Sequence, residues 1–107
     1  MASVKILPNV YWVGAIDWNL RNFHGHTYTT RRGTIYNAYL IVDEKIALVD
    51  TVDALFAQDM IYNIREVVEP ERIDYIIANH VEKDHSGALP EILKLCPKAT
   101  VFWNREV

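Results

Sequence analysis

This sequence has a single cysteine, four glycines and no excess of basic residues. One cysteine, Cys96, excludes an internal disulfide. A net charge of −3 argues against a general nucleic-acid-binding protein, because neutralising phosphates requires a basic surface. No apolar run approaches the length of a membrane span, and the first residues lack the pattern of a signal peptide. We therefore expect a cytoplasmic protein that binds neither nucleic acid nor membranes.

The composition is that of an ordinary globular protein. Half of the 107 residues are hydrophobic and 23% are charged, so one domain with a buried core is expected. There is no internal repeat and no low-complexity segment. Cys96 lies in an apolar row with helical spacing, which favours a buried, unreactive thiol.

Strand patterns dominate the first half of the sequence. A short β-rich run covers 10–13, and two longer runs at 34–42 and 46–50 are joined by the tight turn 43–45, which predicts a hairpin. The segment 17–33 has no regular period and holds several aromatics and histidines. A loop of this length in a small domain is usually functional or packed under another segment.

Helix and strand patterns alternate in the second half. Asp53 is a candidate N-cap for the first helix and Ser86 for the second. The expected elements are a helix over 55–68, a strand over 73–78, a helix that ends before Pro97 and a strand over 100–103. The order β-ββ-α-β-α-β predicts crossover connections and a layered α/β fold.

The stretch HVEKDHSG, residues 80–87, carries the main candidate for chemistry. It directly follows a buried strand, at the end of the sheet where open α/β folds place their sites. His80 and His85 offer imidazole nitrogens, and Glu82 and Asp84 offer carboxylates. Alternate spacing at 80, 82 and 84 suits an extended loop. Four adjacent donors suit two metals side by side, and this donor set favours iron or manganese over a structural zinc site without excluding zinc.

A simpler interpretation needs no metal. His80 could be a strand-end residue that bonds to the backbone, and His85 could be exposed to solvent. Glu82 and Asp84 could stabilise the positive end of the following helix. Each of these explanations is adequate for one residue, but the four donors within six positions favour the metal site.

The motif His80-x-Glu82-x-Asp84-His85 resembles the first ligand motif of the flavodiiron proteins, whose metallo-β-lactamase-like domain carries two irons. Glutamate at the second position is typical of this branch, whereas hydrolytic relatives usually have histidine there. The stretches VYWVGAIDWNLRNFHG, RRGTIYNAYLIVDEKIALVDTV and IDYIIANHVEKDHSGALPEI also resemble the opening of that domain. The resemblance implies the N-terminal half of a metallo-β-lactamase-like αββα sandwich.

The resemblance also implies roles for individual residues. His80 and Glu82 would bind one iron, and Asp84 and His85 the other. Asp50, in LVDT, would support the metal loop from behind the ligands; otherwise it is a strand-end cap. His24 would lie near the substrate pocket, although a hydrogen-bonded loop histidine is an alternative, and His26 is a weaker candidate.

Arg32 and Tyr36 are expected to be structural.

The resemblance further implies the reduction of oxygen to water, of nitric oxide to nitrous oxide, or both. Electrons would arrive through FMN from a donor such as rubredoxin.

The sequence departs from the family pattern because it ends before the later iron ligands and the FMN-binding flavodoxin-like domain. We therefore expect residues 1–107 to form a partial domain that does not bind FMN in the family's way, with a weak partial metal site and negligible turnover alone. Half a sandwich would leave a sheet face uncovered, which predicts a homodimer or docking to the missing remainder. The alternatives are a non-enzymatic metal-binding or oligomerising module and a zinc hydrolase, against which Glu82 argues.

Overall fold

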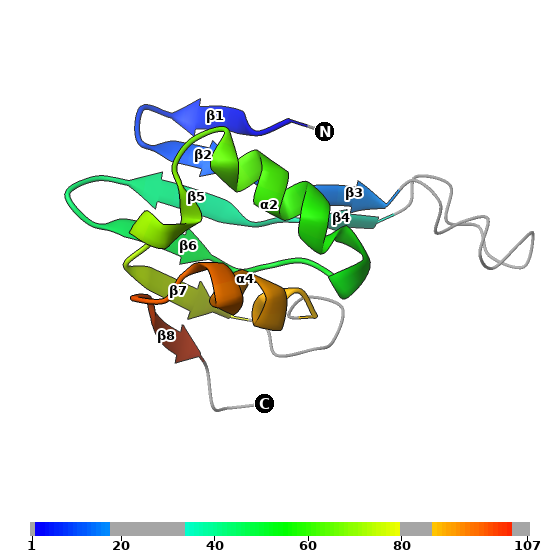
Figure 1. The fold of residues 1–107 in the computed structure, drawn as a ribbon. Helices are drawn as coiled ribbons and strands as arrows, with labels where there is room; N and C mark the ends of the chain where they lie inside the picture. Colours follow the sequence, from blue (N-terminus) through cyan, green and yellow to red (C-terminus); the bar gives the residue numbers. More distant parts are fainter. Residues whose placement is uncertain (1, 18–33, 80–86, 104–107) are drawn as a thin grey trace, which may run out of the picture.

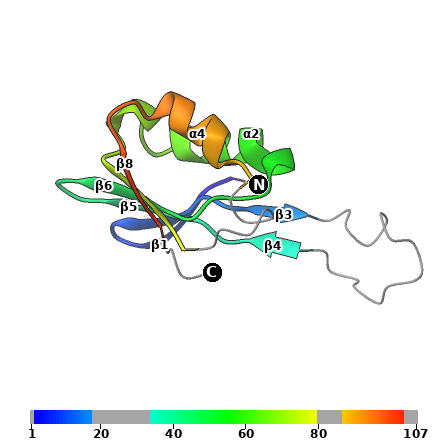
Figure 2. The ribbon, with the colours of Figure 1, turned by 90° about the horizontal axis from the view of Figure 1, so that it is seen from below.

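The computed structural model describes residues 2–17, 34–79 and 87–103. Within them, strands form a six-stranded sheet in the order β1-β2-β5-β6-β7-β8 and a separate two-stranded ribbon of β3 and β4. Helices α2 and α4 lie on the same face of the sheet (Figures 1 and 2). The elements are β1 (Val4–Leu7), β2 (Val10–Trp12), β3 (Ala15–Asp17), β4 (Thr34–Tyr36), β5 (Tyr39–Val42), β6 (Ile46–Val49), the 3-10 turn η2 (Ala54–Phe56), α2 (Ala57–Arg65), the 3-10 turn η3 (Pro70–Arg72), β7 (Tyr75–Ala78), α4 (Leu89–Leu95) and β8 (Thr100–Trp103).

The predicted hairpin and the predicted crossovers are both confirmed. Strands β5 and β6 pair antiparallel from Tyr39 opposite Val49 to Val42 opposite Ile46. The sheet then becomes parallel, since β6 pairs with β7 and β7 with β8 in the same direction. Helices α2 and α4 are the two crossover connections, as parallel neighbours require.

The expected single strand over 34–42 is wrong. It is divided into β4, which pairs with β3 in the ribbon, and β5, which pairs with β2 in the main sheet. The division lies where Gly14 approaches the Tyr36 carbonyl so closely that a Cβ on Gly14 would lie 1.9 Å from that oxygen. Such close backbone approach is available only to glycine.

Strands β1 and β3 were not predicted. Every residue of β1 is exposed, so this edge strand carries no alternation of buried and polar residues that the sequence could reveal. Strand β3 has only three residues and was assigned in part to the irregular segment from 17 onward.

The first predicted helix is shorter than expected. Asp53 Oδ1 accepts a hydrogen bond from the Leu55 amide at 2.9 Å, which confirms the cap, but the turn that follows is the 3-10 turn η2. Helix α2 then begins at Ala57 and ends at Arg65. The second helix, α4, has Pro90 in its first turn, as expected. The candidate cap Ser86 lies outside the described residues.

The core lies between the sheet and the two helices. Leu40, Leu48 and Ile76 project from neighbouring strands and are fully buried against Met60 of α2 and Ile92 of α4. Each of these side chains contributes about 1.5–3 kcal/mol of transfer free energy. In the part of the chain that the structure describes, no helix has the length and apolarity needed to cross a membrane.

The opposite face of the sheet carries several apolar side chains. The partners Ile41 and Ala47, and Ile77 and Phe102, occupy this face by register. Tyr75 contacts Phe102 there, with ring centroids 6.0 Å apart, and 52% of Phe102 is exposed. No helix among the described residues covers this face (Figure 2), in agreement with the expected half sandwich.

Candidate functional site

The candidate metal loop starts where β7 ends. Asn79 directly follows this strand, and the described chain resumes at Gly87. The four predicted ligands, His80, Glu82, Asp84 and His85, lie between these points, outside the described residues. The loop candidates His24, His26 and Arg32 also lie outside them. The structure therefore describes the supports of the candidate site rather than its ligands.

Asp50 holds the first end of this loop. It follows β6, whose parallel neighbour is β7, so the carboxyl ends of the two strands are adjacent. Its Oδ1 accepts a hydrogen bond from the Asn79 backbone amide at 2.7 Å, and its Oδ2 accepts one from Asn79 Nδ2 at 3.3 Å. The Asp50 amide in turn donates to the Ile77 carbonyl at 2.7 Å. The residue before His80 is thus fixed through its main chain and its side chain.

The backbone of Asp50 is unusual. Its φ of 68° makes it the one non-glycine residue with a positive φ among the described segments. This conformation costs about 1–2 kcal/mol for most side chains, although aspartate tolerates it better than most. Strain of this kind persists where surrounding contacts fix the conformation, and it occurs often at functional sites. Here the bonds to Asn79 and Ile77 fix it.

Val52 holds the second end of the loop. Its carbonyl accepts a hydrogen bond from the Ala88 amide at 2.9 Å, and both residues are fully buried. The short segment 50–52 therefore contacts the chain on both sides of residues 80–87. The residues on either side of 80–87 are thus held by one short segment of the chain.

Sequence reasoning predicted a supporting role for Asp50 but missed Asn79 and Val52. Asn79 could have been noticed, because it separates a buried strand from the first candidate ligand and has a side chain that bonds well to carboxylates. Val52 acts through its backbone carbonyl, which every residue has, so the identity of the side chain does not reveal this role. Tyr36 is buried, and its ring centroid lies 5.8 Å from that of Phe56, as expected of a structural residue.

Within residues 2–17, 34–79 and 87–103, no three histidine, cysteine or acidic side chains come together as a metal site would need. Cys96 is only 2% exposed, and burial, with a smaller effect of Glu71, raises the pKa of its thiol to about 11. A thiol in this state is protonated at neutral pH and is neither a nucleophile nor a ready metal ligand. The prediction of a buried thiol is confirmed.

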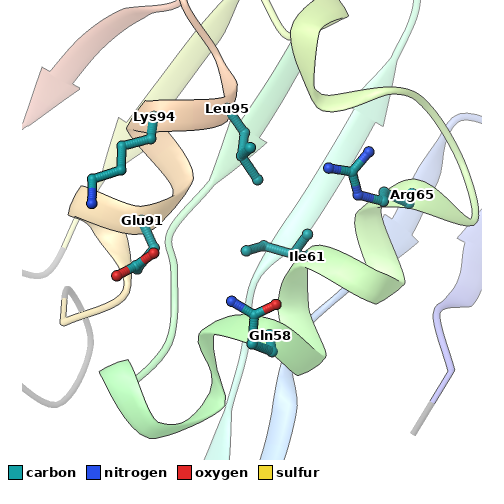
Figure 3. Close-up of a pocket in the computed structure, with 6 residues that line it drawn as sticks. All are labelled: Gln58, Ile61, Arg65, Glu91, Lys94 and Leu95. Atoms are coloured by element: carbon teal, nitrogen blue, oxygen red, sulfur yellow. The ribbon is translucent and has the colours of Figure 1, made fainter.

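Surface hollows elsewhere in the described part of the chain include a groove and an apolar hollow. A groove of about 260 Å³ between α2 and α4 has an apolar floor and polar rims, and Figure 3 shows Arg65 and Lys94 on opposite sides of it. An apolar hollow of about 310 Å³ lies beside the ribbon. Neither is lined by Asp50 or Asn79. The groove is lined by Gln58, Ile61, Arg65, Glu91, Lys94 and Leu95, and the hollow by Val4, Ile6, Trp12, Ile16, Ile35 and Asn37.

Comparison with known proteins places this geometry in a family. Residues 35–107 match the family model described as ODP family beta lactamase. The chain is 53% identical over 99 residues to a nitric oxide reductase of Moorella thermoacetica, covering 92% of this chain and 25% of the relative.

Two solved structures are similar as well. The rubredoxin oxygen:oxidoreductase of Desulfovibrio gigas aligns with a TM-score of 0.83 at 44% identity, over 92% of this chain and 24% of that one. The flavodiiron protein of Giardia intestinalis aligns with a TM-score of 0.83 at 36% identity, over 94% and 24%. The chain thus spans about a quarter of the length of these relatives.

The fold is the first half of a metallo-β-lactamase-like sandwich, in which the described helices lie on one face of the six-stranded sheet and β7 ends where the candidate loop begins. The chain belongs to the ODP family of β-lactamase-like domains, in the group represented by the flavodiiron proteins.

Proposed function

We propose that this chain supplies the first ligands of a dinuclear non-haem iron site in an oxidoreductase that reduces oxygen, nitric oxide or both. The observation that carries the proposal is the double tether of the candidate loop, by Asp50 to Asn79 and by Val52 to Ala88. The tether holds both ends of the segment that contains every predicted ligand. Similarity to the named reductase and oxidoreductase supports the choice of reaction.

The donor set fits iron. Two imidazoles and two carboxylates, with no thiolate in the motif, are typical of non-haem iron sites. His80 and Glu82 would hold one iron, and Asp84 and His85 the other. When bound, the iron pair supplies the redox chemistry for the substrate. Asp50 contributes by holding Asn79, and through it the start of the loop, in one conformation, which reduces the ordering needed when the metals bind.

The remaining parts of such an enzyme would come from outside this chain. Since its relatives are about four times longer, we propose that further iron ligands and an FMN-binding domain belong to a remainder that completes the site. The apolar sheet face around Ile41 and Phe102 is the surface that this remainder, or a second copy of the chain, would cover. A rubredoxin-like electron donor and a cytoplasmic location complete the proposal.

His24 is proposed as a residue of the substrate pocket. It would interact with the bound substrate or its protons rather than with iron. Its support is the family resemblance and its position between β3 and β4 in the sequence.

A chimera tests the proposal. The matching first quarter of the Moorella thermoacetica nitric oxide reductase is replaced by this chain, and the FMN content of the chimera is determined. Nitric oxide consumption is measured under anaerobic conditions, and oxygen consumption is measured in a separate assay. We expect turnover by the chimera and its loss on Glu82→Ala, with Glu71→Ala, an exposed acid outside the loop, as the control. A folded, FMN-loaded chimera that binds no iron would contradict the proposal.

A further inference from the structure

Asn63 is a polar residue at a place where an apolar one would be expected. It lies on the inner face of α2 and is 0% exposed. Its Nδ2 donates a hydrogen bond to the Gly14 carbonyl at 3.0 Å. Its Oδ1 is buried and has no hydrogen-bond partner among the atoms of the described residues.

A half-satisfied buried amide is costly. Burying a polar group without a partner costs about 1–3 kcal/mol in proteins, and leucine of similar volume would avoid the Oδ1 part of this cost. The hydrogen bond from Nδ2 to the Gly14 carbonyl is the favourable interaction that asparagine has and leucine would lack. The Gly14 carbonyl belongs to a buried residue, and among the described residues Asn63 is the side chain that satisfies it.

Gly14 marks the root of the β3–β4 ribbon. Just before it, the Val13 amide donates to the Ala38 carbonyl at 2.8 Å, and just after it the chain leaves the main sheet for β3. The return strand β4 passes at the same point, because the Tyr36 carbonyl lies against Gly14. Figure 1 shows the ribbon extending from the main sheet beside α2. The bond from Asn63 ties this root to the helix.

We propose that Asn63 is a positioning residue that fixes the direction in which the β3–β4 ribbon leaves the sheet. Helix α2 is packed on the sheet through Met60, Ile61 and Ile64, so its position is set by the core. The hydrogen bond from Asn63 holds the Gly14 peptide at a defined place relative to α2. The ribbon itself has only three residue pairs, too few to define its own orientation. Residues 18–33 are joined in sequence to both strands of this ribbon.

Amide hydrogen exchange measured by NMR tests the proposal. In Asn63→Leu, the amides of β3 and β4 should exchange about fivefold to tenfold faster, the factor that one net hydrogen bond is worth, while those of β6 and β7 keep their rates. Gln58→Leu is the matched control, because it also replaces a carboxamide side chain by leucine, at an exposed position of α2, and should leave the ribbon unchanged. Unchanged ribbon rates in Asn63→Leu, or equal acceleration in all strands, would overturn the proposal.

A measurement on the unsubstituted protein does not depend on whether the variant folds. The Asn63 side-chain amide protons should exchange at least about tenfold more slowly than those of exposed Gln58, because one of them is buried in the bond to Gly14. Equal exchange of the two side chains would show that the bond does not persist, and the proposal would then fail.

Discussion

Asp50 and Asn79 are joined by two hydrogen bonds, one from the Asn79 backbone amide at 2.7 Å and one from its Nδ2 at 3.3 Å. The pair joins the ends of two parallel strands, β6 and β7, at the point where the candidate metal loop begins. A backbone with φ of 68° brings the Asp50 carboxylate to this position. The relationship gives Asp50 two separable roles, in hydrogen bonding and in backbone conformation.

Substitutions at Asp50 should separate these roles. Asp50→Gly loses both bonds but accepts a positive φ, and should lower the free energy of unfolding by about 1–2 kcal/mol. Asp50→Ala loses the same bonds and adds backbone strain, so it should cost about 1 kcal/mol more than the glycine variant. Asp50→Asn keeps one acceptor and tolerates the conformation, and should cost the least. Urea unfolding measures all three, and an alanine variant as stable as the glycine variant would contradict this account.

Gly14→Ala should be severely destabilising. The new Cβ would lie 1.9 Å from the Tyr36 carbonyl oxygen, and the neighbour is backbone, which cannot move aside without disturbing β4. We expect a loss of at least about 3 kcal/mol in the free energy of unfolding, or no folded protein. The same urea experiment measures it. If the free energy of unfolding of the variant lay within about 0.5 kcal/mol of that of the unsubstituted protein, the Tyr36 carbonyl would not approach Gly14 as closely as described.

The sequence predicted the parts of the fold that depend on local pattern. The hairpin around 43–45, the two crossover helices and the strand before the motif were all predicted, because hydrophobic period and turn residues determine them. The division of 34–42 into two strands was not predicted. It depends on contact between Gly14 and Tyr36, which are far apart in the sequence, and no local preference encodes that contact.

The candidate site shows the same limit. Asp50 was predicted as a support because a strand-end aspartate and a family resemblance both indicated it. The bond from Ala88 to the Val52 carbonyl could not be predicted, since a main-chain acceptor places no demand on residue type. Asn63 was also missed. The apolar residues around Asn63 predict a helix, but they give no reason for an asparagine on its buried face. The reason is the hydrogen bond to the Gly14 carbonyl, which only the structure shows.

Cys96 should make stability depend on alkaline pH. Burial raises the pKa of its thiol from 9.0 to about 11 in the folded protein. Between these values the unfolded chain binds fewer protons than the folded one, so the free energy of unfolding should fall as pH rises from about 9 to about 11. The contribution is at most about 3 kcal/mol, since each pKa unit corresponds to about 1.4 kcal/mol. In Cys96→Ala this part of the slope should be absent, and identical pH slopes for the two proteins would contradict the prediction.

Asp74 should contribute to stability at the acid end. Its Oδ2 accepts a hydrogen bond from the Ile46 amide at 2.8 Å, and this bond lowers the pKa of Asp74 below its usual 3.8, with a further contribution from Lys98 at 3.3 Å. The stabilisation is present above pH about 4 and is lost as pH falls through the lowered pKa.

Asp74→Asn should therefore reduce the dependence of stability on pH below about 4, which chemical unfolding at a series of pH values measures. Asp59→Asn, which removes an exposed carboxylate on α2, is the control for the loss of one negative charge. If the free energy of unfolding of Asp74→Asn depended on pH below about 4 as in the unsubstituted protein, this carboxylate would not link β6 to β7 in solution.

We propose that Asp50 and Asn79 support an iron-binding loop over 80–87. Native mass spectrometry of the protein, prepared without oxygen and titrated with ferrous iron, tests it most directly, because one spectrum gives chains per particle and irons per chain. We expect up to two irons per chain, none in Glu82→Ala with Asp84→Ala, and about 10–100-fold weaker binding in Asp50→Ala. A protein that binds no iron, or that binds it equally with and without Asp50, would contradict the claim.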